Sequence, residues 1–100
     1  MIEKSEEAGS LVLALSGELD LASAPMLERE LREAEATSPS RLVIDLGGLL
    51  FMDSTGLQAL LRARERANSN GHQLALRRAP HQVQRVFELT KTVDAFTFED

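Results

Sequence analysis

The chain has no cysteine, tryptophan or tyrosine, and its only aromatic residues are four phenylalanines. Without cysteine it can form no disulfide, no thiolate nucleophile and no cysteine-based zinc site, and this composition fits a reducing compartment. We therefore expect a cytoplasmic protein. So few aromatic rings give little basis for a surface on which nucleobases stack, which argues against RNA binding.

Basic residues are also scarce. The 11 lysines and arginines stand against 16 aspartates and glutamates, a formal net charge of -5. A nucleic-acid-binding protein normally shows the opposite balance, so we expect no direct DNA binding. No apolar run approaches the roughly 18 to 20 residues that cross a bilayer, and the segment from Met1 to Glu7 lacks the apolar core of a signal peptide. We expect neither membrane insertion nor export.

The length of the chain limits how many cores it can form. One hundred residues with 43% hydrophobic content suit one hydrophobic core and leave no room for a second. The sequence therefore predicts a single domain over residues 1–100.

The most informative stretch begins with a short aliphatic run, Leu42 to Leu46, which is apolar on both faces apart from Asp45. This pattern is typical of a central strand that is covered on two sides. Apolar residues then recur at helical spacing, at Leu57, Leu60, Leu61 and Ala67. The stretch therefore predicts a central strand followed by an amphipathic helix.

Between this strand and this helix lies the turn Asp53-Ser54-Thr55-Gly56. One interpretation is an N-cap, in which Asp53 or Ser54 accepts a hydrogen bond from the first helical turn. The other is an exposed hydroxyl at the positive end of the helix dipole, where a phosphate would be tolerated. The residue types alone favour capping. Gly56 is expected to serve a close approach or an unusual backbone angle at this turn.

The segments before this stretch predict two strands and a helix. Residues 2–7 could form an edge strand, and residues 11–16 alternate so that their leucine face would lie under helices. A helix should begin at the N-cap Ser23 and end at residues 37–40, which contain Pro39. Its inward side chains would be Met26, Leu27, Leu31 and Ala34.

The segments after it predict a further strand and helix. Asn70 or Gly71 can take the left-handed position that ends a helix, and residues 73–77 read as a strand. Ala79-Pro80 would open a last helix, and residues 93–98 could return as a closing strand. The apolar stripe of that last helix would be Val83, Val86 and Phe87, with Leu89 at its end.

This order of elements predicts an α/β fold: a small mixed, mostly parallel sheet of four to five strands with three or more helices. Strand–helix–strand units require right-handed crossovers onto parallel strands, and the N-terminal hairpin makes the sheet mixed.

Two motifs carry a family resemblance. The segment Phe51-Met52-Asp53-Ser54-Thr55-Gly56-Leu57, preceded by Gly17-Glu18-Leu19-Asp20, resembles the STAS domains of bacterial anti-sigma factor antagonists, and the likeness extends from about Leu11 to Phe98. The resemblance implies the same architecture. It also implies that a partner kinase phosphorylates Ser54, with Thr55 as the second choice, and it reverses the preference for a mere cap.

The resemblance further implies a function by partner exchange. The unphosphorylated protein would bind an anti-sigma factor serine kinase and release a sigma factor, phosphorylation at Ser54 would end that binding, and a serine phosphatase would reset it. The implied partner-binding residues are Glu18, Asp20, Asp53, Ser54, Thr55, Gly56 and Gln58.

The chain departs from the family pattern at two places. Gln58 stands where the family commonly has glycine, and the common Thr-Gly-Leu after the last helix reads Thr90-Lys91-Thr92. Both departures lie at or near the expected contact surface, so they bear on which partner is bound. Two alternatives stay open: an accessory subunit of a lipid-transport ABC ATPase, and a structural or ligand-binding domain in which the turn is only a cap.

The sequence gives little support for a catalytic site. Serine hydrolysis at Ser54 would require His72 or His81 as a base, and no partner acid is evident. The turn is superficially similar to the Asp-Thr-Gly of aspartic proteases, but its spacing differs and the chain has one such turn where two are needed. The two histidines do not form a metal-ligand set, and Gly47-Gly48 lacks the lysine of a phosphate-binding loop. We expect no enzyme activity, no cofactor and no metal.

Overall fold

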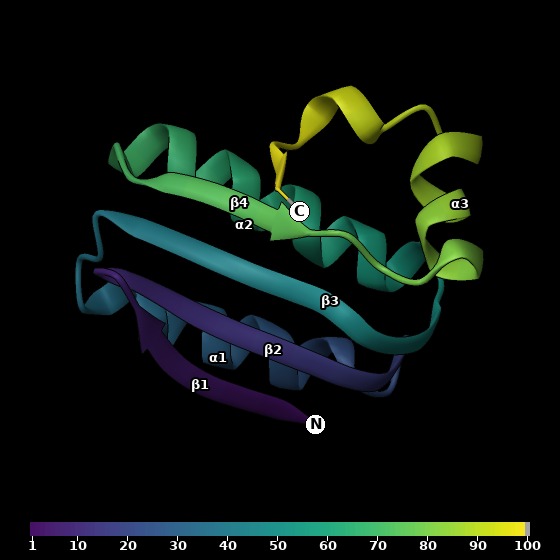
Figure 1. Ribbon diagram of the computed structural model, residues 1–100, viewed down its shortest axis with the longest axis horizontal. Coiled ribbons are helices and arrows are strands. Elements are labelled where there is room, and N and C mark those ends of the chain that lie inside the picture. Colours follow the sequence, from purple (N-terminus) through teal and green to yellow (C-terminus); the bar gives the residue numbers. More distant parts are fainter. Residues whose placement is uncertain (100) are drawn as a thin grey trace.

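The computed structural model describes residues 1–99 and shows a five-stranded sheet with helices packed on it (Figure 1). The strands are β1 (Ile2–Glu7), β2 (Ser10–Leu19), β3 (Arg41–Met52), β4 (Gln73–Arg77) and β5 (Phe98–Glu99). The helices are α1 (Ala24–Ala36), α2 (Ser54–Asn70) and α3 (His81–Leu89), followed by the short 3-10 helix η1 (Val93–Ala95).

The strands lie side by side in the order in which they occur along the chain, so β3 is the middle strand. β1 pairs with β2 in antiparallel fashion, while the pairs β2–β3, β3–β4 and β4–β5 are parallel. The predicted α/β fold with a mixed, mostly parallel sheet is therefore confirmed. Among residues 1–99, no helix is long and apolar enough to cross a membrane.

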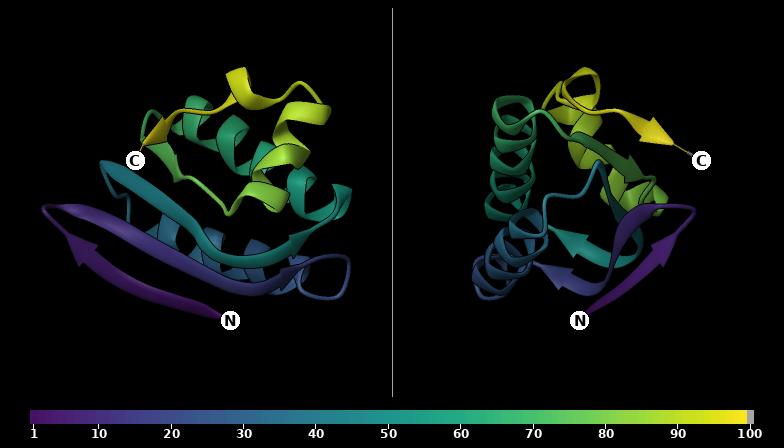
Figure 2. Two further views of the ribbon diagram at one scale, coloured as in Figure 1. Left: turned by 45° about the vertical axis from the view of Figure 1, so that its right-hand side comes forward. Right: turned by 90° about the vertical axis from the view of Figure 1, so that its left-hand side faces the viewer.

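α1 and α2 cover one face of the sheet, behind the strands in Figure 1 and to one side of them in the right panel of Figure 2. The leucine face predicted for residues 11–16 is directed into this core: Leu13 and Leu15 are buried there and Leu11 is partly buried. Phe87 of α3 packs edge to face against Phe96 and Phe98. The largest fully buried side chains include Leu13, Leu27, Leu31, Leu42, Ile44, Leu46, Leu60 and Phe87.

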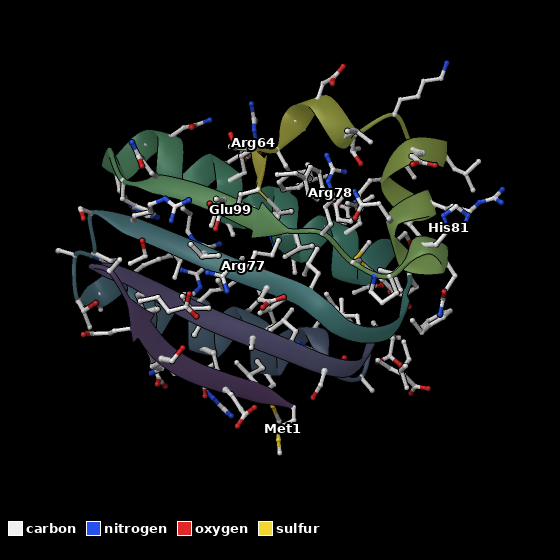
Figure 3. All side chains as sticks on the ribbon, viewed as in Figure 1. Met1, Arg64, Arg77, Arg78, His81 and Glu99 are labelled. Atoms are coloured by element: carbon white, nitrogen blue, oxygen red, sulfur yellow. The ribbon has the colours of Figure 1, made fainter. Side chains whose placement is uncertain are left out.

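The opposite face has a small buried cluster of Val12, Val43 and Ala75 with charged side chains around it. Arg77 donates to Glu7 with a distance of 2.7 Å from Nη2 to Oε1, and its guanidinium also lies 3.6 Å from Asp45 and 3.4 Å from Glu99. Figure 3 shows Arg77 reaching across the strands from the side of Glu99. Arg77 therefore links both edge strands, β1 and β5, to the middle of the sheet.

α1 begins where predicted, but the role of Ser23 and the position of Met26 differ from the prediction. Ser23 occupies the N-cap position but makes no capping bond, because its hydroxyl donates to the Glu18 carbonyl at 2.7 Å and accepts from the Asp20 N–H at 2.9 Å. Met26 is 48% exposed, because it lies at the border of the buried stripe. That stripe consists of Ala24, Leu27, Leu31 and Ala34.

Three strand boundaries also differ from the prediction. β2 continues past Ser16 as far as Leu19. The middle strand continues past Leu46 as far as Met52. Residues 93–98 do not form one strand: 93–95 form η1, and only Phe98–Glu99 pair, with Leu76 and Arg77. Gly71 ends α2 with a φ of 79° in the left-handed region, as predicted.

Candidate functional site

The end of β3 is irregular. Its register against β2 shifts twice, from Ala14–Asp45 to Ser16–Gly48 and again from Gly17–Leu49 to Glu18–Phe51. At each shift β3 holds one residue more than β2, which is a β-bulge, and bulges change the direction in which the following side chains point. Leu50 and Phe51 are consequently 68% and 50% exposed, although they belong to the middle strand.

Asp53 ties the following turn to the neighbouring strand. Its N–H donates to the Leu19 carbonyl at 3.1 Å, as the last bond between β3 and β2. Its Oδ1 accepts from the N–H of Gly56 at 3.1 Å, so Asp53 is the N-cap of α2. The capping role considered for Asp53 in the sequence is therefore confirmed, and the same residue fixes where the helix starts.

Gly56 lies directly against Leu19. A Cβ atom at this position would lie 2.6 Å from Leu19 Cγ and 2.8 Å from the Leu19 carbonyl oxygen, distances at which atoms overlap. Its φ is not positive, so of the two reasons offered for this glycine, close approach is confirmed and an unusual backbone angle is wrong. The approach holds the first turn of α2 on the end of β2.

Ser54 is the first residue of α2 and is exposed, whereas Thr55 is half-buried. Neither hydroxyl makes a hydrogen bond within residues 1–99. The N–H groups in the first turn of a helix have no intrahelical acceptor, and the helix dipole makes this end positive. The Ser54 hydroxyl is thus accessible, unpartnered and placed where a phosphate is electrostatically favoured.

The segment Glu18–Asp20 lies beside this turn. Glu18 is exposed and pairs with Phe51 in the sheet, while Leu19 between the carboxylates is buried and anchors the loop, as predicted. Asp20 Oδ1 accepts from the N–H groups of Ala22 and Ser23, each at 3.1 Å. Asp20 therefore shapes the entry into α1, and it directly follows Leu19, which contacts the turn.

The structure brings the predicted partner-binding residues to one edge of the sheet, where the parallel strands β2 and β3 end. Gln58 is exposed one helical turn after Ser54, so both side chains lie on the same side of α2. The predicted set divides into two segments: Glu18 and Asp20 at the end of β2, and Asp53, Ser54, Thr55, Gly56 and Gln58 after β3.

Sequence reasoning missed the exposed apolar side chains around the turn. Leu21, which follows Asp20 directly, is 73% exposed, and Leu50 and Phe51 precede Asp53. Exposed apolar side chains that gather at one place indicate an interaction surface. The sequence signal was Gly47-Gly48, which could have indicated a bulge, but alternation alone would have placed either Leu50 or Phe51 inside.

Neither histidine is placed as a base for Ser54. His72 follows the C-terminus of α2, at the opposite end of that helix from Ser54. His81 is exposed in the first turn of α3, at the outer side of the molecule in Figure 3, and makes no hydrogen bond within the described part of the chain. Among residues 1–99 no group of three histidine, aspartate or glutamate side chains is arranged to hold a metal ion.

In sequence, the chain is similar to known anti-sigma factor antagonists. The anti-sigma-F factor antagonist RsfB of Mycobacterium tuberculosis is 39% identical over 62 residues, which are 62% of this chain and 51% of that protein, so the match spans about half of RsfB. The anti-sigma F factor antagonist of Paenibacillus polymyxa is 31% identical over 90 residues, 89% of this chain and 77% of that relative.

A solved structure and a family model agree with these relatives. The crystal structure of an anti-sigma factor antagonist from Mycobacterium paratuberculosis superimposes with a TM-score of 0.89 at 29% identity, over 98% of this chain and 83% of that one. The model of the STAS domain matches residues 1–100. The chain therefore belongs to the STAS domain family.

Proposed function

We propose that this protein is an anti-sigma factor antagonist that is switched by phosphorylation of Ser54. In the unphosphorylated form it binds an anti-sigma factor serine kinase, and the sigma factor held by that kinase is released. The observation that carries the proposal is the exposed, unpartnered hydroxyl of Ser54 at the N-terminus of α2, in a chain whose relatives are antagonists of this kind.

The surroundings of Ser54 suit a protein partner. Leu21, Leu50 and Phe51 are at least half exposed and would supply the apolar contacts that interfaces bury at their centre. Glu18 and Gln58 are exposed beside them and would form a polar rim. A neutral serine hydroxyl can be buried in such an interface at little cost.

A phosphate on Ser54 changes the interface more than the fold. It adds about -1.5 to -2 charges at neutral pH. The dipole of α2 attracts this charge and the Asp53 carboxylate repels it, and each effect is of order 1 kcal/mol. An interface that packs the neutral hydroxyl must instead desolvate a dianion. A hundredfold loss of affinity corresponds to only about 2.8 kcal/mol, which this desolvation can supply.

The rest of the proposed cycle follows from the switch. A serine phosphatase restores the unphosphorylated form, the protein acts in the cytoplasm, and its contribution is binding, without catalysis of its own. Co-purification with a transporter ATPase in place of a kinase would favour the accessory-subunit alternative.

The direct test is phosphorylation in vitro. The protein is incubated with ATP and an anti-sigma factor serine kinase from the same genome, and the modified residue is located by peptide mass spectrometry. Wild type and Thr55→Ala should each gain one phosphate, and Ser54→Ala should gain none. Labelling that persists in Ser54→Ala and disappears in Thr55→Ala would move the site by one residue, and labelling of no variant would contradict the proposal.

A further inference from the structure

A cavity of about 540 Å³ lies at the end of the sheet opposite to Ser54. Its walls come from the C-terminal half of α2, the start of β4 and the segment that joins η1 to β5. Ser54 follows the end of β3, whereas the β4 residues that line the cavity pair with the beginning of β3. A volume of this size is in the range of pockets that hold small molecules, roughly 300 to 1,000 Å³.

His72 lines this cavity and leaves a polar atom without a partner. Its Nε2 is buried and makes no hydrogen bond within residues 1–99. A buried polar atom without a hydrogen bond costs free energy, so native structures normally supply a partner from protein, water or ligand. With the ring hydrogen on Nε2, His72 can donate to an oxygen atom in the cavity once its ring turns, because in the present orientation this nitrogen is buried.

Arg64 lines the same cavity and is the second group without a partner. The other two arginines of α2 are paired with α1: Arg66 with Glu35 at 2.8 Å and Arg62 with Glu28 at 3.2 Å. Arg64 lies on the side of α2 toward β5 (Figure 3) and has no hydrogen bond or ion pair within the described residues. A guanidinium is the side chain best suited to bind a carboxylate or a phosphate.

The other residues that line the cavity also determine which kind of ligand would fit. Arg41 also borders the cavity, but its charge is already balanced by Glu99. Asp94 is the carboxylate of the lining and is exposed. Leu74 and Phe96 supply an apolar wall. Within residues 1–99, the cavity thus combines an unpaired guanidinium, a buried imidazole nitrogen without a partner and an apolar wall.

We propose that this cavity binds a small organic anion, with its carboxylate or phosphate group on Arg64 and His72 and its apolar body against Leu74 and Phe96. The proposal goes beyond the partner switch at Ser54 and does not depend on it. Binding there would couple a small molecule to the packing of η1 and of the segment that leads into β5 on α2, because residues of these segments line the cavity.

The test uses the two histidines, His72 in the cavity and His81 on the surface. The imidazole resonances of the whole chain are followed by NMR while phenyl phosphate or benzoate is added at constant ionic strength and pH. The resonances of His72 should shift and saturate, and those of His81 should not. Inorganic phosphate should bind more weakly than phenyl phosphate if the apolar wall contributes, and comparison of the two organic probes separates phosphate from carboxylate preference.

Arg64→Gln should weaken binding about tenfold or more, the loss expected for a charge-assisted hydrogen bond. Arg29→Gln, which alters an exposed arginine of α1 outside the cavity, should bind like wild type. Thermal melting checks that both variants are folded. An unmoved His72 with both organic probes at millimolar concentration would overturn the proposal and leave water as the occupant. Equal affinity of Arg64→Gln and wild type, or equal shifts of His72 and His81, would overturn it as well.

Discussion

At the scale of single residues, Gly56 determines how closely the turn that carries Ser54 can approach β2. A Cβ at Gly56 would overlap both the side chain and the carbonyl of Leu19. Backbone cannot move aside cheaply, so Gly56→Val should lower the free energy of unfolding by about 1 to 3 kcal/mol. It should also weaken partner binding, because the turn must move away from Glu18. Urea denaturation and a kinase titration measure the two effects.

Ser54→Ala is the matched control for this change, because it alters an exposed side chain of the same turn. Its unfolding free energy should stay within about 0.5 kcal/mol of wild type. Normal stability and normal binding of Gly56→Val would show that the close contact with Leu19 is not needed.

Lys91 is a second residue at which the backbone conformation determines how a substitution changes stability. α3 ends in a Schellman motif, in which the Thr92 N–H donates to the Phe87 carbonyl at 2.9 Å and the Lys91 N–H donates to the Glu88 carbonyl at 3.2 Å. Lys91 occupies the left-handed position of this motif with a φ of 60°. Glycine is the usual residue there because a Cβ is unfavourable in this conformation.

Lys91→Gly should therefore raise the unfolding free energy by up to about 1 kcal/mol, after allowing for the greater freedom of glycine in the unfolded chain. Lys91→Ala retains the Cβ and should show no such gain. Urea denaturation of both variants is the measurement. A Lys91→Gly variant less stable than Lys91→Ala would refute the strain assigned to this position.

At the scale of elements, the edge strands depend on Arg77. Arg77 lowers the pKa of the Glu7 carboxyl below its ordinary value of 4.5, first through its hydrogen bond and then through its charge. A carboxyl whose pKa is lowered in the folded state contributes stability above its unfolded pKa, and this contribution is lost as the pH falls through the folded pKa. The Glu7–Arg77 pair should thus contribute to the pairing of β1 at neutral pH, in addition to its main-chain bonds with β2, and this contribution should be lost in acid.

Arg77→Gln should return the pKa of Glu7 to its ordinary range, as followed by NMR of the Glu7 side-chain carboxyl during an acid titration. The amides of β1 should then exchange with solvent faster than in wild type at neutral pH. Arg85→Gln, on an exposed position of α3, should leave both observations unchanged. An unaltered Glu7 titration in Arg77→Gln would mean that the pair does not form in solution.

Sequence periodicity was sufficient for most elements because their buried faces repeat regularly. The stripe Leu27–Leu31–Ala34 and the alternation in residues 11–16 each have one period, and both predictions hold. β3 was harder to predict, because two bulges change its period inside the strand and alternation cannot show where they lie. Residue type also favoured Ser23 as a cap, but it cannot tell that the Ser23 hydroxyl is engaged by Glu18 and Asp20.

The sequence predicted the residues that shape the backbone of the site, but it did not predict which apolar side chains are exposed around it. Asp53 as a cap and Gly56 at a close approach follow from what those residue types do at a helix start. The exposure of Leu50 and Phe51 depends on the bulges of β3, and that of Leu21 depends on how Asp20 turns the loop. These features are set by contacts between strands and could not be read from local patterns.

At the scale of the whole molecule, the proposed switch lies at one end of the sheet and the cavity at the other. The turn at Ser54 is held by main-chain bonds of Asp53 and by the packing of Gly56 on Leu19, and neither involves the Ser54 hydroxyl. Phosphorylation can therefore change the surface without changing these contacts. The phosphorylated protein should keep the circular dichroism spectrum and the melting temperature of the unmodified one to within a few degrees.

The most direct test of this account is the affinity of the unphosphorylated and the Ser54-phosphorylated protein for the anti-sigma factor kinase, measured by calorimetric titration. Ser54→Ala, which cannot be modified at this position, is the control and should bind like the unphosphorylated protein. The account predicts that phosphorylation weakens binding about a hundredfold or more, equivalent to about 2.8 kcal/mol, with an unchanged fold. Undiminished affinity of the phosphorylated protein, or a loss of affinity that accompanies unfolding of the domain, would contradict it.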